Sequence, residues 1–348
     1  MHTTLLVQED YILVTSPSPS PSLSPLNSQS SSSQREQARE LIWLLASLRS
    51  TLSELRGGLE DCAGLLTPPA NGSDTAASST LALTTVRNET VKGYATRVGT
   101  QLVRGLVHLK LRTLPPQTLS LDPARPVGVA ALTRLDALLA RAVALCLDLE
   151  EHERRRPPPS APYLAAQLRL LSQHIADAAA LVRGPPRPVP PAAQAVTWTP
   201  PAPDAAWTTC SVSLGHFAPP VSRNLSLYVT IQDACLVLYL RALEPAGAPV
   251  NFGTKLALAI GTTRRLEHDE ADKVFRYRCD DESYVEGAEP REAAGGGKEV
   301  DVYVREKVRV ESVDPSLLSL SAKLYALSNT LDLARRNLAA VMGEEMED

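Results

Sequence analysis

The chain has 348 residues, of which 44% are hydrophobic, and its formal net charge is −4. This length allows about two domains, and the hydrophobic content is sufficient for sizeable cores. A negative net charge and only 4% aromatic residues, without a basic stripe, argue against a nucleic-acid partner. Because no apolar run approaches the ~20 residues of a membrane span, membrane insertion is not expected.

The cysteines indicate the redox environment. They are odd in number, widely scattered and without a CxxC pair: Cys62, Cys146, Cys210, Cys235 and Cys279. A reduced chain is the simplest interpretation. The N-terminus lacks the basic region and continuous apolar core of a secretory signal. We therefore expect a soluble cytoplasmic protein.

The chain begins with a low-complexity stretch and then becomes helical. Residues 1–32 include alternating serine and proline over 16–22, which predicts a disordered tail. Ser33-Gln34-Arg35-Glu36 has the form of a capping box and predicts a helix over 33–66. Two heptad series mark its apolar seam, Leu45, Leu52, Leu59, Leu66 and the companions Leu41, Leu48, Leu55, Cys62.

Strand-like sequence and two further helices follow. Residues 80–112 contain alternating apolar positions and predict strands. Apolar residues again recur with helical spacing over 127–183, which predicts two helices. Pro162 marks the start of the second of these helices, and Gly184 marks its end. The two seams are Leu132, Leu135, Leu139, Ala142, Cys146, Leu149 and Leu164, Leu168, Leu171, Ile175, Ala178, Val182. Residues 184–206 form a proline-rich linker.

Residues 207–311 predict a second β region. Every second residue of Leu225–Ile231 is apolar, as in a strand with one buried face. Gln232-Asp233 predicts a turn into a second strand over 234–243. Shorter strands are expected over 254–260 and 273–277, and valines alternate along 300–310.

A last helix is predicted over 315–343. Asp314 can cap it, Pro315 suits its first position, and Gly343 marks its end. Leucine recurs every seventh residue, and a second series interleaves with it: Leu317, Leu324, Leu331, Leu338 and Leu320, Leu327, Ala334, Val341. No basic arm precedes these leucines, so the segment is not a DNA-binding zipper.

Together these elements predict an α+β protein. Residues 33–66, 127–183 and 315–343 would form an elongated, antiparallel, coiled-coil-like helical bundle, and residues 80–112 and 207–311 an antiparallel β domain. Both domains are discontinuous in sequence. Four seams in one chain favour an intramolecular bundle, and a dimeric zipper is the alternative.

Catalytic chemistry finds little support in the sequence. Gly295-Gly296-Gly297-Lys298 resembles the end of a phosphate loop but lacks its first glycine and its Ser/Thr. His268-Asp269-Glu270, with Glu267, has no second histidine at helical spacing, so an acidic turn is favoured over a metal site. His174 and Asp233 are interpreted as a helix residue and a turn residue. No catalytic, cofactor-binding, metal-binding or partner-binding residue is predicted, and no enzyme is expected.

Three segments carry a resemblance to a known family. ETVKGYATRVGTQLVRGLVHLKL (residues 89–111), FAPPVSRNLSLYVTIQDACLVLYLRAL (217–243) and VREKVRVESVDPSLLSLSAKLYAL (304–327) resemble the Rogdi family of leucine-zipper-containing proteins. The similarity covers roughly residues 36–345 and consists of diffuse hydrophobic patterns. The tail, the linker 184–206 and an insert near 284–298 have no counterpart in it.

This resemblance implies a fold and a role. The fold would be an elongated helical bundle beside a β domain, with the two chain ends meeting in the bundle. The role would be that of the small, non-enzymatic subunit of the RAVE complex, which promotes assembly of the vacuolar-type proton ATPase. The implied partners are a large WD-repeat subunit, peripheral-sector subunits of the ATPase and, in some lineages, a small ubiquitin-ligase-type adaptor. The implied location is the cytoplasm, with recruitment to vacuolar and endosomal membranes. A homodimeric coiled-coil adaptor in trafficking, unrelated to the pump, is the alternative.

Overall fold

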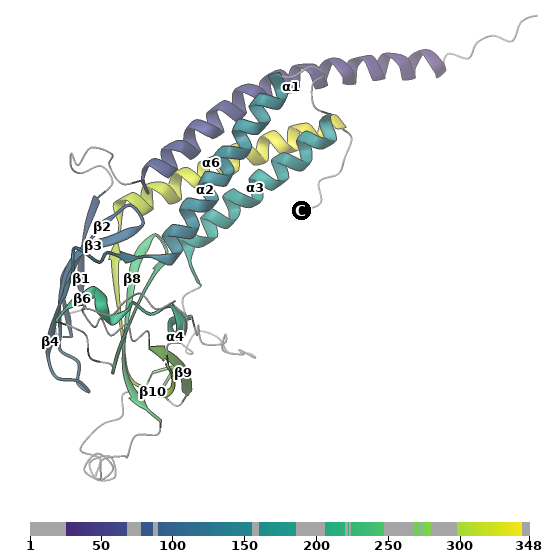
Figure 1. The fold of residues 1–348 in the computed structure, drawn as a ribbon. Helices are drawn as coiled ribbons and strands as arrows, with labels where there is room; N and C mark the ends of the chain where they lie inside the picture. Colours follow the sequence, from purple (N-terminus) through teal and green to yellow (C-terminus); the bar gives the residue numbers. More distant parts are fainter. Residues whose placement is uncertain are drawn as a thin grey trace, which may run out of the picture.

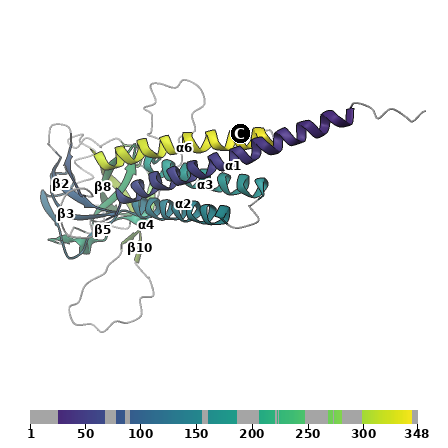
Figure 2. The same ribbon diagram turned by 90° about the horizontal axis from the view of Figure 1, so that it is seen from above.

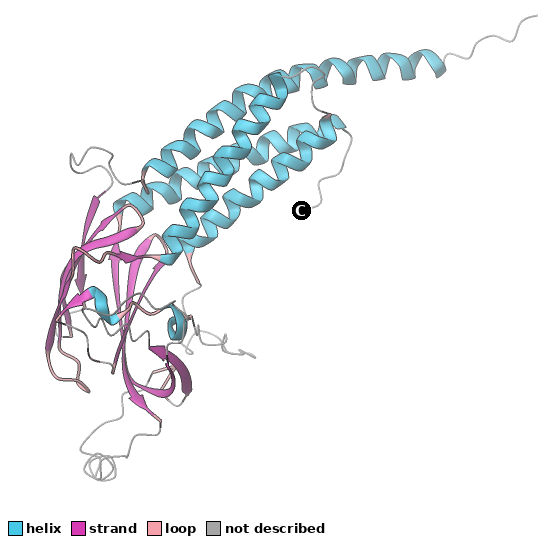
Figure 3. Cartoon of the chain, in the orientation of Figure 1, coloured by secondary structure: helices cyan, strands magenta, loops and turns pink. Residues whose placement is uncertain are grey.

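The computed structural model of the chain describes residues 26–67, 78–85, 90–154, 160–185, 206–219, 222, 224–246, 268–271, 273–279 and 298–342. The long helices gather at one end of the molecule and the strands at the other (Figures 1 and 3). Several sequence predictions lie outside the described residues. These are most of the tail, the linker over 186–205, the strand over 254–260, Glu267 and the glycines 295–297.

Four long helices pack side by side: α1 (Leu26–Gly64), α2 (Ala130–Arg154), α3 (Ala161–Arg183) and α6 (Pro315–Met342). Each helix contacts two others, in the cyclic order α1, α2, α3, α6, and neighbouring helices run in opposite directions (Figures 1 and 2). Polar side-chain contacts join three of the four pairs of neighbouring helices. Arg56 on α1 bonds to Glu150 on α2 at 3.0 Å, and Lys323 on α6 bonds to Asp61 on α1 at 2.8 Å. Arg335 on α6 bonds to Ser172 on α3 at 3.1 Å. The coiled-coil-like geometry expected for this bundle stays a prediction.

Helix α1 begins earlier than the capping box predicts. It starts at Leu26, so Ser33 lies within the helix and the predicted start at residue 33 is wrong. The physical reason is the absence of proline between Pro25 and Pro68. Every backbone N–H in this stretch can therefore donate within a helix. Figures 1 and 2 show α1 extending past the ends of the other three helices.

The first sheet is antiparallel. It contains β1 (Ser78–Thr84), β2 (Val91–Val98), β3 (Gln101–Leu109), β4 (Gln117–Leu121) and β6 (Phe217–Ala218) in that order, and β5 (Val127–Gly128) pairs with β3. Strands β4 and β5 fall outside the predicted strand region. They have only five and two residues, which is too short for an alternating pattern to be recognised.

The second sheet is also antiparallel. Its order is β7 (Leu225–Gln232), β8 (Cys235–Pro245), β10 (Lys298–Val313) and β9 (Val274–Cys279). The inner faces of the two sheets meet in a core that includes Leu83 and Leu119 from the first sheet and Leu227 and Leu238 from the second. The same apolar core continues into the helices. The α+β class is therefore confirmed, whereas the proposed division into domains stays a prediction.

Candidate interaction surface

The tip of the β7–β8 hairpin is fixed against the end of α3. Asp233 and Ala234 both have positive φ, 50° and 58°, as a two-residue hairpin turn requires. Their N–H groups donate to the carbonyls of Arg183, at 2.8 Å, and Val182, at 3.0 Å. These carbonyls belong to the last turn of α3, where the C=O groups have no N–H partner within the helix. Asp233 therefore has the turn role that the sequence predicts.

Gly184 makes this contact sterically feasible. It ends α3 with φ 68°, and its N–H donates to the carbonyl of Ala180 at 2.8 Å. A Cβ atom at this position would lie 2.2 Å from the carbonyl oxygen of Ile231. Only glycine accommodates both the backbone angle and the close approach.

One edge of β7 remains unpaired along part of its length. β7 is the first strand of its sheet, with β8 on one side only. The pairing of Gln232 with Cys235 across the two-residue turn fixes which residues bond to β8. Because hydrogen-bonded and outward-facing residues alternate, the backbone groups of Leu227, Val229 and Ile231 face away from β8. The carbonyl of Leu227 accepts from the N–H of Val212 at 2.7 Å, which agrees with this register.

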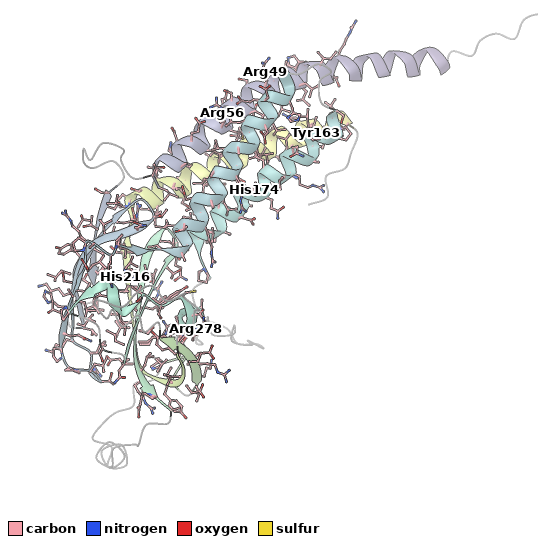
Figure 4. All side chains as sticks on the ribbon, viewed as in Figure 1. Arg49, Arg56, Tyr163, His174, His216 and Arg278 are labelled. Atoms are coloured by element: carbon pink, nitrogen blue, oxygen red, sulfur yellow. The ribbon has the colours of Figure 1, made fainter. Side chains whose placement is uncertain are left out.

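A groove of about 950 Å³ runs beside this edge. Its walls are α2, the end of α3, the outer part of β7 and the segment that includes α4 (Trp207–Cys210) and the turn Leu214–His216. Small side chains leave this space open, among them Ala130, Ala137, Ala180 and Ala206. His216 lies at the sheet end of the helices (Figure 4), where its Nδ1–H donates to the carbonyl of Arg125 at 2.8 Å.

The charged side chains in the groove are mainly basic. Arg134 and Arg141 line it from α2, and both are exposed. Among the described residues neither arginine has an ion-pair partner. Asp177 on α3 is the one carboxylate along the described lining. The groove therefore combines open backbone groups, small apolar side chains and two arginines that have no carboxylate partner among the described residues.

A buried ion pair joins the helices to both sheets. Arg97 on β2 and Asp314, between β10 and α6, lie 2.6 Å apart, and both side chains are fully buried. Asp314 Oδ1 also accepts from the hydroxyl of Ser79 on β1 and from the N–H of Ser316, each at 3.0 Å. The second contact is the helix cap that the sequence predicts. Nothing in the local sequence marks Arg97, because its partner is 217 residues away.

A second ionic cluster lies in the other sheet. Arg241 on β8 donates two hydrogen bonds to Glu270, at 2.7 and 3.0 Å, and Lys307 on β10 donates to Glu270 at 2.6 Å and to Asp269 at 2.9 Å. The guanidinium also stacks 4.5 Å from the centre of the Trp207 ring. Burial acts to raise the pKa values of both carboxylates, but the bonds and charges of the cations outweigh it and both pKa values are lowered.

The remaining sequence candidates stay apart from the groove. His268 lies beside this cluster, where burial lowers its pKa, and its Nδ1 accepts from the N–H of Glu270 at 3.2 Å. His174 lies half-buried on α3 (Figure 4), and Lys298 begins β10. Across the described residues no cluster of three metal-ligating side chains occurs. No helix in the part of the chain that the structure describes is long and apolar enough to cross a membrane.

The heptad leucines lie in the interior of the four helices. Leu52, Leu59, Leu66, Leu317, Leu324, Leu331 and Leu338 are buried, whereas Leu45 is half-buried against the same core. Of the companion series, Leu48, Leu55, Cys62 and Leu320 are buried. Burial raises the pKa of the Cys62 thiol to about 11 and that of Cys146 to about 12. These thiols therefore stay protonated at neutral pH.

Comparison with known proteins gives one family. A family model described as Rogdi leucine zipper containing protein matches residues 40–339. No curated protein matches the chain significantly. The matched region includes most of all four long helices and both sheets. The chain therefore belongs to the family of Rogdi leucine zipper containing proteins.

Proposed function

We propose that this chain is a non-catalytic subunit of a RAVE-like complex that promotes assembly and reassembly of the vacuolar-type proton ATPase. Membership of the Rogdi family over residues 40–339 is the observation that carries the proposal. The subunit would help to join the peripheral sector of the ATPase to its membrane sector, and so support organelle acidification.

The arrangement of charged groups is consistent with an assembly role. Arg97, Asp314, Arg241 and Glu270 are buried and paired with one another inside the protein. They tie strands to each other and to α6 instead of converging on the groove. Such internal pairing suits a rigid platform, whereas a catalytic site needs reactive groups in a cleft.

The proposed partners follow from the same role. They are a large WD-repeat, β-propeller subunit, peripheral-sector subunits of the ATPase and, in some lineages, a small ubiquitin-ligase-type adaptor. The protein would act in the cytoplasm and be recruited peripherally to vacuolar and endosomal membranes. The coiled-coil-like bundle would hold the groove and the exposed helix faces in a fixed geometry for these contacts.

Cells that lack the protein test this proposal. They are expected to retain both ATPase sectors but to join them poorly, so that organelle pH rises and growth becomes sensitive to elevated pH and calcium. Affinity purification from cell extract is expected to recover the β-propeller subunit together with peripheral-sector subunits. Normal organelle pH and intact sector assembly in the null cells would rule out this function.

A homodimeric coiled-coil adaptor in trafficking, unrelated to the pump, is the second candidate. The observation that favours it is the outer face of α6, where Leu318 and Tyr325 are seven residues apart and 47% and 70% exposed. A second copy covering this face would make the protein a dimer. Light scattering on the purified chain separates the two candidates, since the first is expected to give a monomer.

A further inference from the structure

We propose that the groove beside β7 binds an extended acidic segment of a partner protein, which adds to the second sheet as a strand. The inference deepens the proposed function and rests on it for the identity of the partner complex. The chemistry of the groove itself supplies the argument. Two independent features point to this occupant: the open edge of β7 and the pair of arginines that line the same groove from α2.

The backbone of β7 supplies the pairing groups. The N–H and C=O of Val229 face away from β8, and no described residue bonds to them. Ile231 faces the same way but is only 1% exposed beside the end of α3, so the half-exposed Val229 is the accessible pairing residue. Residues 228–231 all line the groove. An unpaired strand edge binds an extended peptide through main-chain hydrogen bonds, which need no particular side chains. The pairing residues of the peptide must not be proline, because proline has no N–H.

The arginines select the charge of the peptide. Arg134 and Arg141 are seven residues apart, so they lie about 10 Å apart along α2. Residues on one face of a strand recur about every 7 Å. Two carboxylates with one residue between them therefore lie about 7 Å apart, and two with three residues between them lie about 14 Å apart. The spacing of the arginines falls between these two distances, and the flexible arginine side chains span the difference. Each guanidinium offers a forked pair of donors that matches a carboxylate.

The chain's own linker is the main competitor for this position. It leaves the described region after Pro185 and re-enters it at Ala206, and both residues line the groove. However, residues 186–205 contain a single carboxylate, Asp204, together with Arg187 and seven prolines. This composition cannot supply partners for both arginines. An acidic partner segment satisfies them and pairs with the strand edge at the same time.

The test uses the purified full-length chain and a display library of random twelve-residue peptides. Selection is expected to enrich peptides with at least two acidic residues and with no proline between them. The double variant Arg134→Glu/Arg141→Glu is expected to weaken binding of these peptides by at least about tenfold, since attraction becomes repulsion. Arg134→Lys/Arg141→Lys should retain more of the affinity. Arg49→Glu, on the exposed surface of α1 away from the groove (Figure 4), is the matched control and should leave it unchanged.

Amide hydrogen exchange locates the bound peptide. The amide of Val229 should exchange rapidly in the free chain and slow on addition of a selected peptide. The amide of Thr230 points towards β8 and serves as the internal reference, slow in both states. Unchanged exchange at Val229 on binding would overturn strand addition. Slow exchange at Val229 in the free chain would show that the linker or a second copy already covers the edge, and would overturn the proposal of a partner segment.

The two proposals fail separately. Peptide binding is measured with purified protein and involves no proton pump. Enrichment of peptides that bind the charge-reversed variant equally well would overturn the binding of an acidic segment in the groove but leave the assembly role. Normal sector assembly in null cells, with peptide binding intact, would remove the assembly role and leave the groove as a binding site.

Discussion

The guanidinium of Arg97 and the carboxylate of Asp314 are joined at 2.6 Å although 217 residues separate them in the chain. The pair connects β2, in the first sheet, to the start of α6, and both side chains are inaccessible to solvent. This contact explains how the long C-terminal helix is held in one orientation relative to the strands.

Removal of one partner of this pair should be strongly destabilising. Arg97→Met is expected to lower the free energy of unfolding by about 3–5 kcal/mol, because the Asp314 carboxylate would remain buried without its partner. Asp314→Asn should have a similar effect, although asparagine still caps a helix well. Urea denaturation of both single variants and the double variant measures this. If the two single effects simply add in the double variant, the coupling between the residues is absent.

The four-helix packing predicts the effect of truncating a seam leucine. Leu324 is fully buried in α6, and Leu324→Ala is expected to cost about 2–5 kcal/mol. The melting temperature should fall by the same amount at every protein concentration, because the contacts lie within one chain. A midpoint that rises strongly with protein concentration would instead indicate an intermolecular zipper.

Two adjacent glycines in α1 should respond differently to alanine. A Cβ on Gly57 meets nothing within 4 Å, whereas a Cβ on Gly58 would lie 2.6 Å from Leu327 Cδ2 in α6. Gly57→Ala should stabilise the protein by up to about 1 kcal/mol through helix propensity. Gly58→Ala should gain less or destabilise it, because Leu327 has to move. Thermal melts compare the two variants, and adding Leu327→Ala should restore part of the difference. Equal gains in both variants would show that α1 and α6 are not in close contact at Gly58.

The ionic cluster around Glu270, which also contains Arg241, Lys307 and Asp269, predicts a pH dependence of stability. In the folded protein the pKa of Glu270 lies below its ordinary value of 4.5. Its contribution to stability is therefore complete above about pH 4.5 and is lost as the pH falls through the lower, folded value. Glu270→Gln should reduce stability at neutral pH and weaken the further loss on acidification. Glu299→Gln is the control, because Glu299 is exposed and its contact with Arg278 is long, at 3.5 Å. Such an exposed ion pair contributes little to stability. An identical acid dependence in Glu270→Gln and the unaltered protein would contradict the expectation.

Thiol reactivity should separate the cysteines. Cys210 is exposed, whereas Cys62 and Cys146 are buried with raised thiol pKa values. A maleimide reagent at neutral pH should modify Cys210 rapidly and the two buried thiols only after unfolding, because the thiolate is the reactive form. Mass spectrometry of digested protein follows each residue. Equal rates at Cys62 and Cys210 in the folded protein would show that the α1 seam opens.

Much of the helical part of the fold was predictable because its signals are local. Pro162 and Gly184 mark the two ends of α3 in the sequence, and Asp314 and Pro315 mark the start of α6. The same holds for the Leu225–Gln232 strand and its turn. The start of α1 was mispredicted because a local capping pattern carries no information about the helix upstream of it.

The candidate surface could not be predicted in the same way. The groove exists because Arg134, on α2, and Val229, on β7, are brought together by tertiary packing. The role of Arg97 likewise depends on a partner at the other end of the chain. Neither the open edge of β7 nor the lack of an ion-pair partner for the two arginines among the described residues has a sequence signature. Only the register of the hairpin and the arrangement of helices reveal them.

The contact between α1 and α6 has a consequence during protein synthesis. Asp61 and Lys323 meet across 262 residues, so the inner leucines of α1 leave the ribosome long before their partners on α6 exist. Native contacts of such long range form late, and exposed apolar surface in the meantime promotes aggregation. The nascent chain is therefore expected to need chaperone protection over α1 until translation ends. A chain cut short before residue 315 would carry a permanently incomplete bundle, and quality control should degrade it.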